Sequence, residues 1–126
     1  MRLLLDTNVL LWTLTIPERL SAAAARAIQD SENRVYVSVV SPWEISIKTS
    51  LGSLPALDDL EPQLAEMHFD LLPIALPHTK AIESLPHHHR DPFDRMLIAQ
   101  AQVEGLTIVT SDREMRRYQV ALLPAI

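Results

Sequence analysis

Four acidic side chains stand at points where an apolar run of the sequence gives way to a helical pattern or to a turn. They are Asp6, Glu44, Asp94 and Asp112. Carboxylates that come close together repel one another unless cations lie between them. Their hard oxygen atoms are the ligands that suit Mg²⁺ or Mn²⁺. If the fold gathers these side chains, they predict the chemistry of a divalent-metal site.

Each acid also has a purely structural explanation. Glu44 could return a hydrogen bond to Ser41 in a capping box. Asp94 could be an acid favoured by the dipole of a helix N-terminus, and Asp112 could cap the short turn that follows it. Asp6 is the hardest to explain in this way, because a carboxylate that ends a run of three leucines is partly desolvated and needs a partner. The metal interpretation therefore rests on the set of acids and not on any one of them.

Short apolar runs alternate with longer segments of helical periodicity along the chain. The runs that predict strands are 3–5, 35–40, 70–75, 106–109 and 120–123. The segments that predict helices are 18–31, 43–51, 60–68 and 92–104, the last with Asp91 as its N-cap and Gly105 at its end. The alternation predicts one domain, residues 1–126, built as a three-layer α/β/α sandwich around a mainly parallel sheet of about five strands.

This topology determines where the acids meet. In a parallel sheet with right-handed crossovers, the carboxyl ends of the strands and the amino ends of the following helices share one edge. Asp6 and Asp112 follow predicted strands, and Glu44 and Asp94 lie in the first turns of predicted helices. We therefore expect all four carboxylates at that edge.

The composition excludes several other kinds of site. The chain has 126 residues, of which 48% are hydrophobic and 21% charged, as in a folded globular protein. It has no cysteine, which excludes thiolate ligands and cysteine nucleophiles, and its two glycines lie too far apart for a phosphate-cradling loop. The net charge of −5 argues against purely electrostatic binding of nucleic acid, although bound cations would change the local balance. No apolar stretch is long enough to span a membrane, so we expect a cytoplasmic protein without a membrane partner.

Basic and aromatic residues lie near the acids in the sequence. Five arginines are candidate phosphate contacts, with a solvated charged face as the alternative: Arg90, Arg95, Arg113, Arg116 and Arg117. Consecutive side chains cannot all face one ion, so the run His87–His89 predicts a solvated loop, with one histidine at most reaching a substrate phosphate, and not a zinc site. Trp12 and Trp43 belong to apolar patterns and are expected in the core.

Four short motifs contain the acids and follow one another along most of the chain. They are LDTNVL at 5–10, SPWEI at 41–45, HRDPFDRMLIAQA at 89–101 and TSD at 110–112. In this order and at these separations they resemble a PIN-domain ribonuclease of the VapC toxin type. The resemblance implies that the four acids surround one or two Mg²⁺ or Mn²⁺ ions, with Asn8 and Ser111 supporting the site.

The resemblance also implies an activity and partners. Water acidified by the metal would attack phosphorus in an RNA strand. The backbone of that strand would be positioned by Arg90, Arg95 and Arg113. The protein would then be a metal-dependent endoribonuclease, and the toxin of a toxin–antitoxin pair that inhibits translation or growth. A homodimer and a cognate antitoxin protein that covers the acidic site are expected with it.

Two other functions compete with this one. An aspartyl-phosphate enzyme would use Asp6 as its nucleophile. Two features argue against that enzyme: the residue two positions later is Asn8, and the only lysines, Lys48 and Lys80, leave no ammonium after the fourth predicted strand. A catalytically inactive PIN-like module that binds RNA or protein is the second alternative, and the presence of all four acids argues against it.

Overall fold

The computed structural model describes residues 1–126 and has a central sheet of five strands. The strands are β1 (Arg2–Leu5), β2 (Arg34–Ser38), β3 (Asp70–Leu72), β4 (Thr107–Thr110) and β5 (Leu122–Pro124). Their order across the sheet is β3-β2-β1-β4-β5, and every neighbouring pair is parallel. Parallel neighbours need long crossover connections, and the helices supply them.

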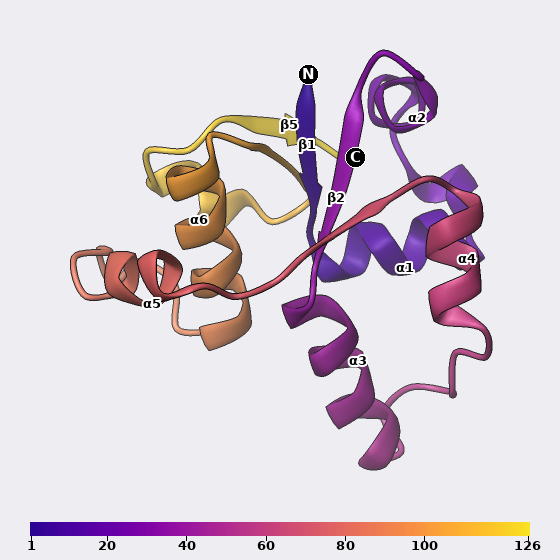
Figure 1. The fold of residues 1–126 in the computed structure, drawn as a ribbon, viewed down its shortest axis with the longest axis horizontal. Helices are drawn as coiled ribbons and strands as arrows, with labels where there is room; N and C mark the ends of the chain where they lie inside the picture. The colour runs from indigo at the N-terminus through magenta and orange to yellow at the C-terminus, as the bar shows by residue number, and fades with distance from the viewer.

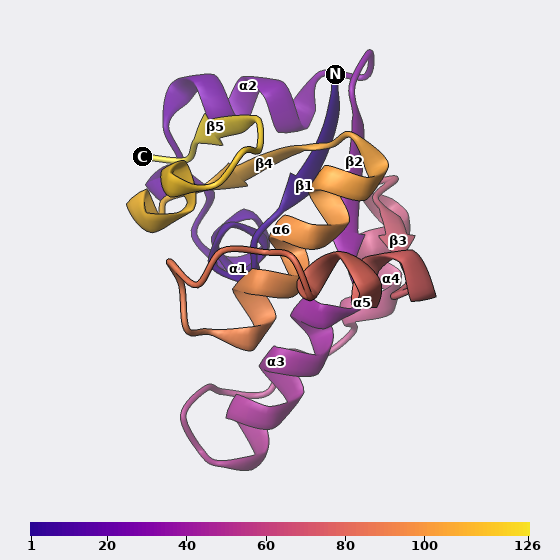
Figure 2. The same cartoon turned by 90° about the vertical axis from the view of Figure 1, so that its left-hand side faces the viewer.

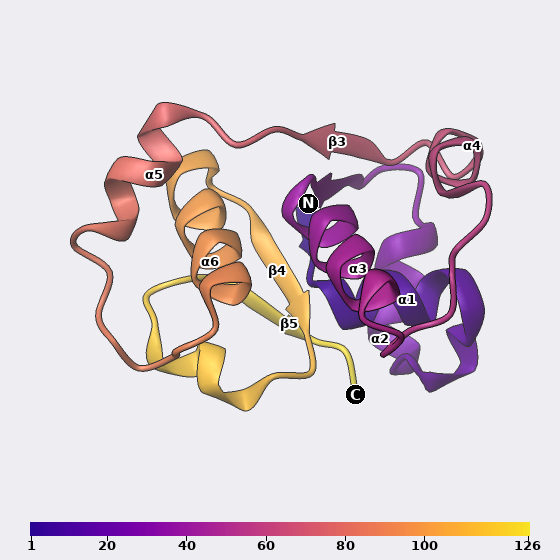
Figure 3. The ribbon, with the colours of Figure 1, turned by 90° about the horizontal axis from the view of Figure 1, so that it is seen from below.

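Helices cover both faces of the sheet. The α-helices are α1 (Thr7–Thr15), α2 (Ala22–Gln29), α3 (Val40–Ser50), α4 (Leu60–Glu66), α5 (Leu76–Ile82) and α6 (Pro92–Glu104). Helices α5 and α6 lie on one side of the strands, and α1, α2 and α4 lie on the other (Figures 1 and 3). Helix α3 projects away from the carboxyl edge of the sheet (Figure 2). The predicted three-layer α/β/α architecture is confirmed, and none of the helices has both the length and the apolar composition of a membrane span.

The innermost strand shows why the sheet needs two helical layers. Leu3, Leu4 and Leu5 of β1 have no exposed surface. Because successive side chains of a strand point to opposite faces, Leu3 and Leu5 join the larger core cluster, of 13 buried residues, while Leu4 joins a second cluster of 10. A continuous apolar run of this kind is stable only when both faces are covered.

Aspartate side chains cap the N-termini of the two helices α1 and α6, which begin beside the predicted site. The Asp6 side chain caps α1 directly after β1, and the Asp91 side chain accepts hydrogen bonds from the first turn of α6. Gly105 ends α6 with a φ of +69°, a conformation that favours glycine. The predicted N-cap role of Asp91 is therefore confirmed.

Several predicted boundaries were wrong. Residues 76–82 form α5, which we did not predict because Pro77 was interpreted as a break, whereas proline in the first turn begins a helix. The long first helix is shorter than predicted, since Ser21 caps it and Pro17–Arg19 form a separate 3₁₀ turn. The capping box of Ser41 and Glu44 is absent, because α3 already begins at Val40.

Candidate functional site

The four acids predicted from the sequence lie together at the carboxyl edge of the sheet. Their side chains line one cavity of about 120 Å³, which contains no hydrophobic residue. The remaining lining residues are Thr7, Asn8, Lys48 and Asp91. We call this the acidic cavity. The crossover topology gathers the acids as expected, since the elements that carry them are far apart in the sequence.

Asp6 forms the floor of the acidic cavity, and both of its carboxylate oxygens are held. Oδ1 accepts a hydrogen bond of 2.8 Å from the Val9 amide, and Oδ2 accepts one from the Thr110 hydroxyl. The residue is 5% exposed. Burial disfavours its charged form and raises the pKa of Asp6 to about 6, although its two hydrogen bonds oppose that shift and the charges of Asp112 and Glu44 add to it.

Thr110 links two of the acids. Its hydroxyl donates to Asp6 and accepts a 2.9 Å hydrogen bond from the Asp112 amide. The Asp112 carboxylate in turn accepts from the Glu114 amide at 2.9 Å, so its predicted role as the cap of the following turn is also confirmed. The backbone at the end of β4 therefore fixes Asp112 relative to Asp6.

Asp94 lies in the first turn of α6, beside Asp91. Asp91 Oδ1 accepts from the amides of Phe93 and Asp94 at 2.8 and 3.3 Å, so Asp91 caps the helix and Asp94 lines the cavity. Burial, followed by the charge of Asp91, raises the pKa of Asp94 to about 7, against a lowering contribution from His89. Asp94 and Asp6 are thus the two acids of the cavity whose pKa values are raised.

Glu44 comes from α3 and is paired with a lysine. Its Oε2 lies 2.8 Å from Lys48 Nζ one turn later, and this hydrogen bond raises the pKa of Lys48 above its usual range. The hydroxyls of Thr7 and Ser41 lie 3.0 Å apart and join α1 to α3 behind the cavity. Glu44 is therefore oriented by its own helix and carries a counter-charge with it.

His89 reaches the acids from the loop before α6. Its Nε2 lies 2.7 Å from Asp112 Oδ2 and 3.2 Å from Asp94 Oδ2, and these three side chains are close enough to share one ion. Its Nδ1 accepts a hydrogen bond of 3.1 Å from the Asp91 amide, so the ring proton resides on Nε2. His89 is consequently a hydrogen-bond donor to the carboxylates, and the Asp91 amide opposes its use as a direct metal ligand.

The acidic cavity fits a divalent cation. Five carboxylates line it against the single ammonium of Lys48. Burial raises the pKa values of Asp6 and Asp94, and the charges of neighbouring carboxylates add to the shift. A cation held by the carboxylate oxygen atoms would favour their charged forms and reduce the repulsion between them. The donor set of carboxylates suits Mg²⁺ or Mn²⁺.

The other predicted site residues lie at the rim of the acidic cavity or outside it. Asn8 is exposed at the rim of the acidic cavity, whereas Ser111 lines a neighbouring cavity. Arg90 is exposed in the loop before α6. Arg95 is 8% exposed and donates to the carbonyls of Pro86 and Leu85 at 2.7 and 3.2 Å, so its prediction as a phosphate contact was wrong.

The aromatic prediction needs a correction too. Trp43 was expected in the core but is 56% exposed, because it lies near the start of the projecting helix α3. Its ring packs edge to face on Phe93 with 5.0 Å between centroids. Trp12 is partly buried against the core and lies under the Arg19 guanidinium.

Known proteins resemble this chain in sequence and in fold. The sequence model of the PIN domain matches residues 3–121. The chain belongs to the PIN-domain family. It is 32% identical over 121 residues to Ribonuclease VapC22 of Mycobacterium tuberculosis, covering 92% of this chain and 91% of that protein. The family resemblance read from the four motifs is thereby confirmed.

Solved structures share the fold at lower identity. VapBC2 from Rickettsia felis, crystallised with a DNA fragment from its promoter, has a TM-score of 0.73 and 14% identity, with full coverage of both chains. FitAcB from Neisseria gonorrhoeae has a TM-score of 0.69 and 24% identity, with 97% of this PIN-domain chain and 96% of that chain covered. These likenesses show that the PIN-like fold is common to all three.

Sequence reasoning missed three residues that contact the acids of the acidic cavity. His89 is the first residue of the third motif, but as the last of three consecutive histidines it was predicted to lie in a solvated loop and not beside the acids. Lys48 had a usable signal, since it stands four residues after Glu44 and side chains at that spacing meet on a helix. Thr110 is the first residue of the TSD motif, but nothing local indicated its contact with Asp6, because 104 residues of sequence separate the two.

Proposed function

We propose that this PIN-domain protein is a metal-dependent endoribonuclease and the toxin of a toxin–antitoxin pair. The observation that carries the proposal is the single polar cavity in which Asp6, Glu44, Asp94 and Asp112 converge. The likeness to Ribonuclease VapC22 along almost the whole chain supports RNA as the substrate.

The acids would hold Mg²⁺ or Mn²⁺. Asp6 and Asp94 are the central candidates, because their raised pKa values mark the carboxylates that gain most from a cation; Glu44 and Asp112 complete the set. When bound, such an ion neutralises charge on a phosphate and acidifies water. Hydrolysis then adds water across a P–O3′ bond and leaves 5′-phosphate and 3′-hydroxyl ends.

The protein's own groups orient the acids for this reaction. The Val9 amide and the Thr110 hydroxyl prevent rotation of the Asp6 carboxylate. The Nε2 proton of His89 holds Asp112 and Asp94 from the loop side. Lys48 carries positive charge to the rim, where it attracts a phosphate group. Preorganised groups of this kind act without reorganising during the reaction.

Partners follow from the same proposal. VapC-type likeness supports a cognate antitoxin, a homodimer and action on cytoplasmic RNA. An arginine supplied by the antitoxin could pair with the carboxylates and take the place of metal, since a guanidinium binds carboxylates bidentately. The aspartyl-phosphate alternative gains nothing from the geometry, because both oxygens of Asp6 already accept hydrogen bonds.

To test the proposal, purified protein that is free of any partner is incubated with a total-RNA pool and Mg²⁺, Mn²⁺ or EDTA. The new 5′ ends of the RNA are then sequenced. Asp6→Asn is run beside it, with Asp58→Asn as the control, since Asp58 is an exposed acid outside the cavity. We expect metal-dependent cuts at a few sites, lost in Asp6→Asn and kept in Asp58→Asn. Cleavage that survives Asp6→Asn would overturn the proposal, and RNA binding without cleavage would favour the inactive module.

A further inference from the structure

A second cavity adjoins the acidic cavity and shares Asp112 with it. Its volume is about 340 Å³, within the range of about 300–1,000 Å³ in which proteins hold small molecules. It lies at the carboxyl ends of β4 and β5, the strand pair at one side of the sheet. We call it the arginine cavity, after Arg113 and Arg116 in its lining.

These two arginines differ from the others of the same region. Arg117 lies 3.3 Å from Glu114, and Arg95 is buried against carbonyls. Arg113 and Arg116 are exposed, and neither forms an ion pair or a side-chain hydrogen bond in the structure. Two unpaired guanidinium groups on one cavity wall are suited to bind phosphate oxygens, each by a pair of hydrogen bonds.

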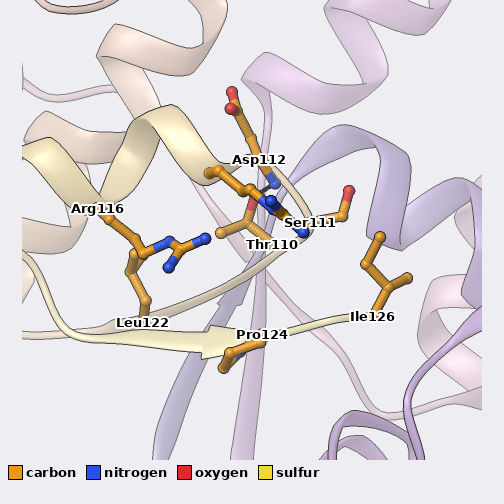
Figure 4. Close-up of a pocket in the computed structure, with 8 residues that line it drawn as sticks. Thr110, Ser111, Asp112, Arg116, Leu122, Pro124 and Ile126 are labelled. Carbon is orange, nitrogen blue, oxygen red and sulfur yellow. Dashed lines mark hydrogen bonds between the residues drawn. The ribbon is translucent and has the colours of Figure 1, made fainter.

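The opposite wall is apolar. Leu122 and Pro124 of β5 lie below Arg116, and Ile126 lies to one side (Figure 4). The Asp112 carboxylate points away from Leu122 and Pro124. Cationic groups facing an apolar surface match the two parts of a nucleotide, a charged phosphate and a flat base, because bases bind apolar and guanidinium surfaces in single-stranded RNA.

We propose that the arginine cavity binds one nucleotide of the RNA strand next to the phosphate that is cleaved. Arg113 and Arg116 hold its phosphate, and its base or ribose lies against Leu122 and Pro124. Asp112 belongs to both cavities, so a strand seated in one passes directly into the other. This inference rests on the proposed ribonuclease function, and it identifies the residues that contact the RNA next to the cleaved phosphate.

The test measures RNA affinity in protein that cannot cleave. In an Asp6→Asn background with Mg²⁺, binding of a short, fluorescein-labelled, random-sequence single-stranded RNA is followed by anisotropy. The variants are Arg113→Gln and Arg116→Gln, singly and together, and the control for each single variant is Arg117→Gln, which also removes one positive charge from the same turn. We expect the double variant to bind at least about 10-fold more weakly, and the salt dependence to fall by about 0.7 for each lost phosphate contact. The control should bind as the parent does.

The outcomes separate this inference from the proposed function. Equal affinity of the double variant and the control overturns the arginine cavity as a nucleotide site, whether or not the wild type cleaves RNA. An arginine-dependent affinity in a wild type that never cleaves RNA supports the cavity and overturns the nuclease. If the double variant loses only a protein partner and keeps its RNA affinity, the nucleotide assignment is wrong.

A second measurement addresses the apolar wall. Once a cleaved RNA is identified, 4-thiouridine is placed at successive positions around the cut, and cross-linked residues are mapped by mass spectrometry on the Asp6→Asn protein. We expect a position beside the cut to cross-link within residues 122–126. Cross-links that fall only outside that segment would overturn the placement.

Discussion

The acidic cavity and the arginine cavity share Asp112 but are built in opposite ways. In the acidic cavity, Asp6 and Glu44 are buried and held by hydrogen bonds or an ion pair. In the arginine cavity, Arg113 and Arg116 are exposed and unpaired. The difference separates two tasks. Side chains that bind an ion must be held close together before it binds, which costs electrostatic repulsion. Side chains that contact RNA strands of different sequence stay conformationally mobile until the strand binds.

The comparison predicts different kinetic signatures for the two cavities. Asp94→Asn should lower kcat for RNA cleavage by at least about 100-fold, because loss of even an outer contact of a metal site commonly costs 10–100-fold. The double arginine variant should instead raise KM and leave kcat near the wild-type value. Steady-state cleavage of one identified RNA checks both. A large fall of kcat in the arginine variant would show that the cavities do not divide the tasks.

Burial of the acids in the acidic cavity, together with the repulsion between them, should make the stability depend on pH. The folded pKa values of Asp6 and Asp94, about 6 and about 7, exceed the ordinary aspartate pKa of 3.8, so the folded state binds more protons than the unfolded state between these values. The free energy of unfolding of metal-free protein therefore falls as pH rises from about 4 to about 7, by about 2 kcal/mol or more. Thermal melts in EDTA measure it, and Mn²⁺ should reverse it.

The same repulsion predicts that neutral substitutions stabilise the metal-free protein. Asp6→Asn and Asp94→Asn should each raise the melting temperature in EDTA at pH 7 and flatten its pH dependence. Asp58→Asn, outside the cavity, provides the control. Lower melting temperatures for both Asn variants would contradict a shared carboxylate cluster.

Much of this molecule could be predicted from the sequence, because the signals were local. A few neighbouring residues are enough to recognise each of these signals. They are the leucine run of β1, the proline and glycine at the two ends of α6, and the acids at the strand ends. The predictions for Arg95 and Trp43 were wrong because the position of each side chain depends on the tertiary structure and not on its neighbours in the sequence. Arg95 lies in the core because Leu85 and Pro86, in the preceding loop, offer carbonyls to it. Trp43 is exposed because α3 leaves the sheet, which no local pattern records.

His89 should produce a smaller effect than the acids. Its Nε2 proton holds Asp112 and Asp94, so His89→Ala should weaken Mn²⁺ binding and cleavage by about 10-fold, as expected for an outer contact of a metal site. His87→Ala removes an exposed member of the same run and should leave both unchanged. Cleavage measured against Mn²⁺ concentration separates the two effects: saturating metal should restore part of the lost rate. No difference between the two variants would remove His89 from the site.

Lys48 should have the smallest effect. Lys48→Met leaves the buried Glu44 carboxylate without its partner and should lower the stability of metal-free protein by less than about 1 kcal/mol, because the lysine is half exposed. Mn²⁺ should restore most of that loss. Lys80→Met breaks the surface pair with Glu83 and serves as the control, with no response to metal. If Mn²⁺ does not restore the stability lost in Lys48→Met, Lys48 does not balance the charge of the acidic cavity.

The most direct test of the central claim, that the acidic cavity is a divalent-metal centre, is a Mn²⁺ titration followed by electron paramagnetic resonance. Wild type, Asp94→Asn and Asp58→Asn are compared at neutral pH without RNA. We predict bound Mn²⁺ in the wild type and in Asp58→Asn, and a loss of binding of at least about 100-fold in Asp94→Asn. Equal Mn²⁺ binding by Asp94→Asn and the wild type would contradict the account.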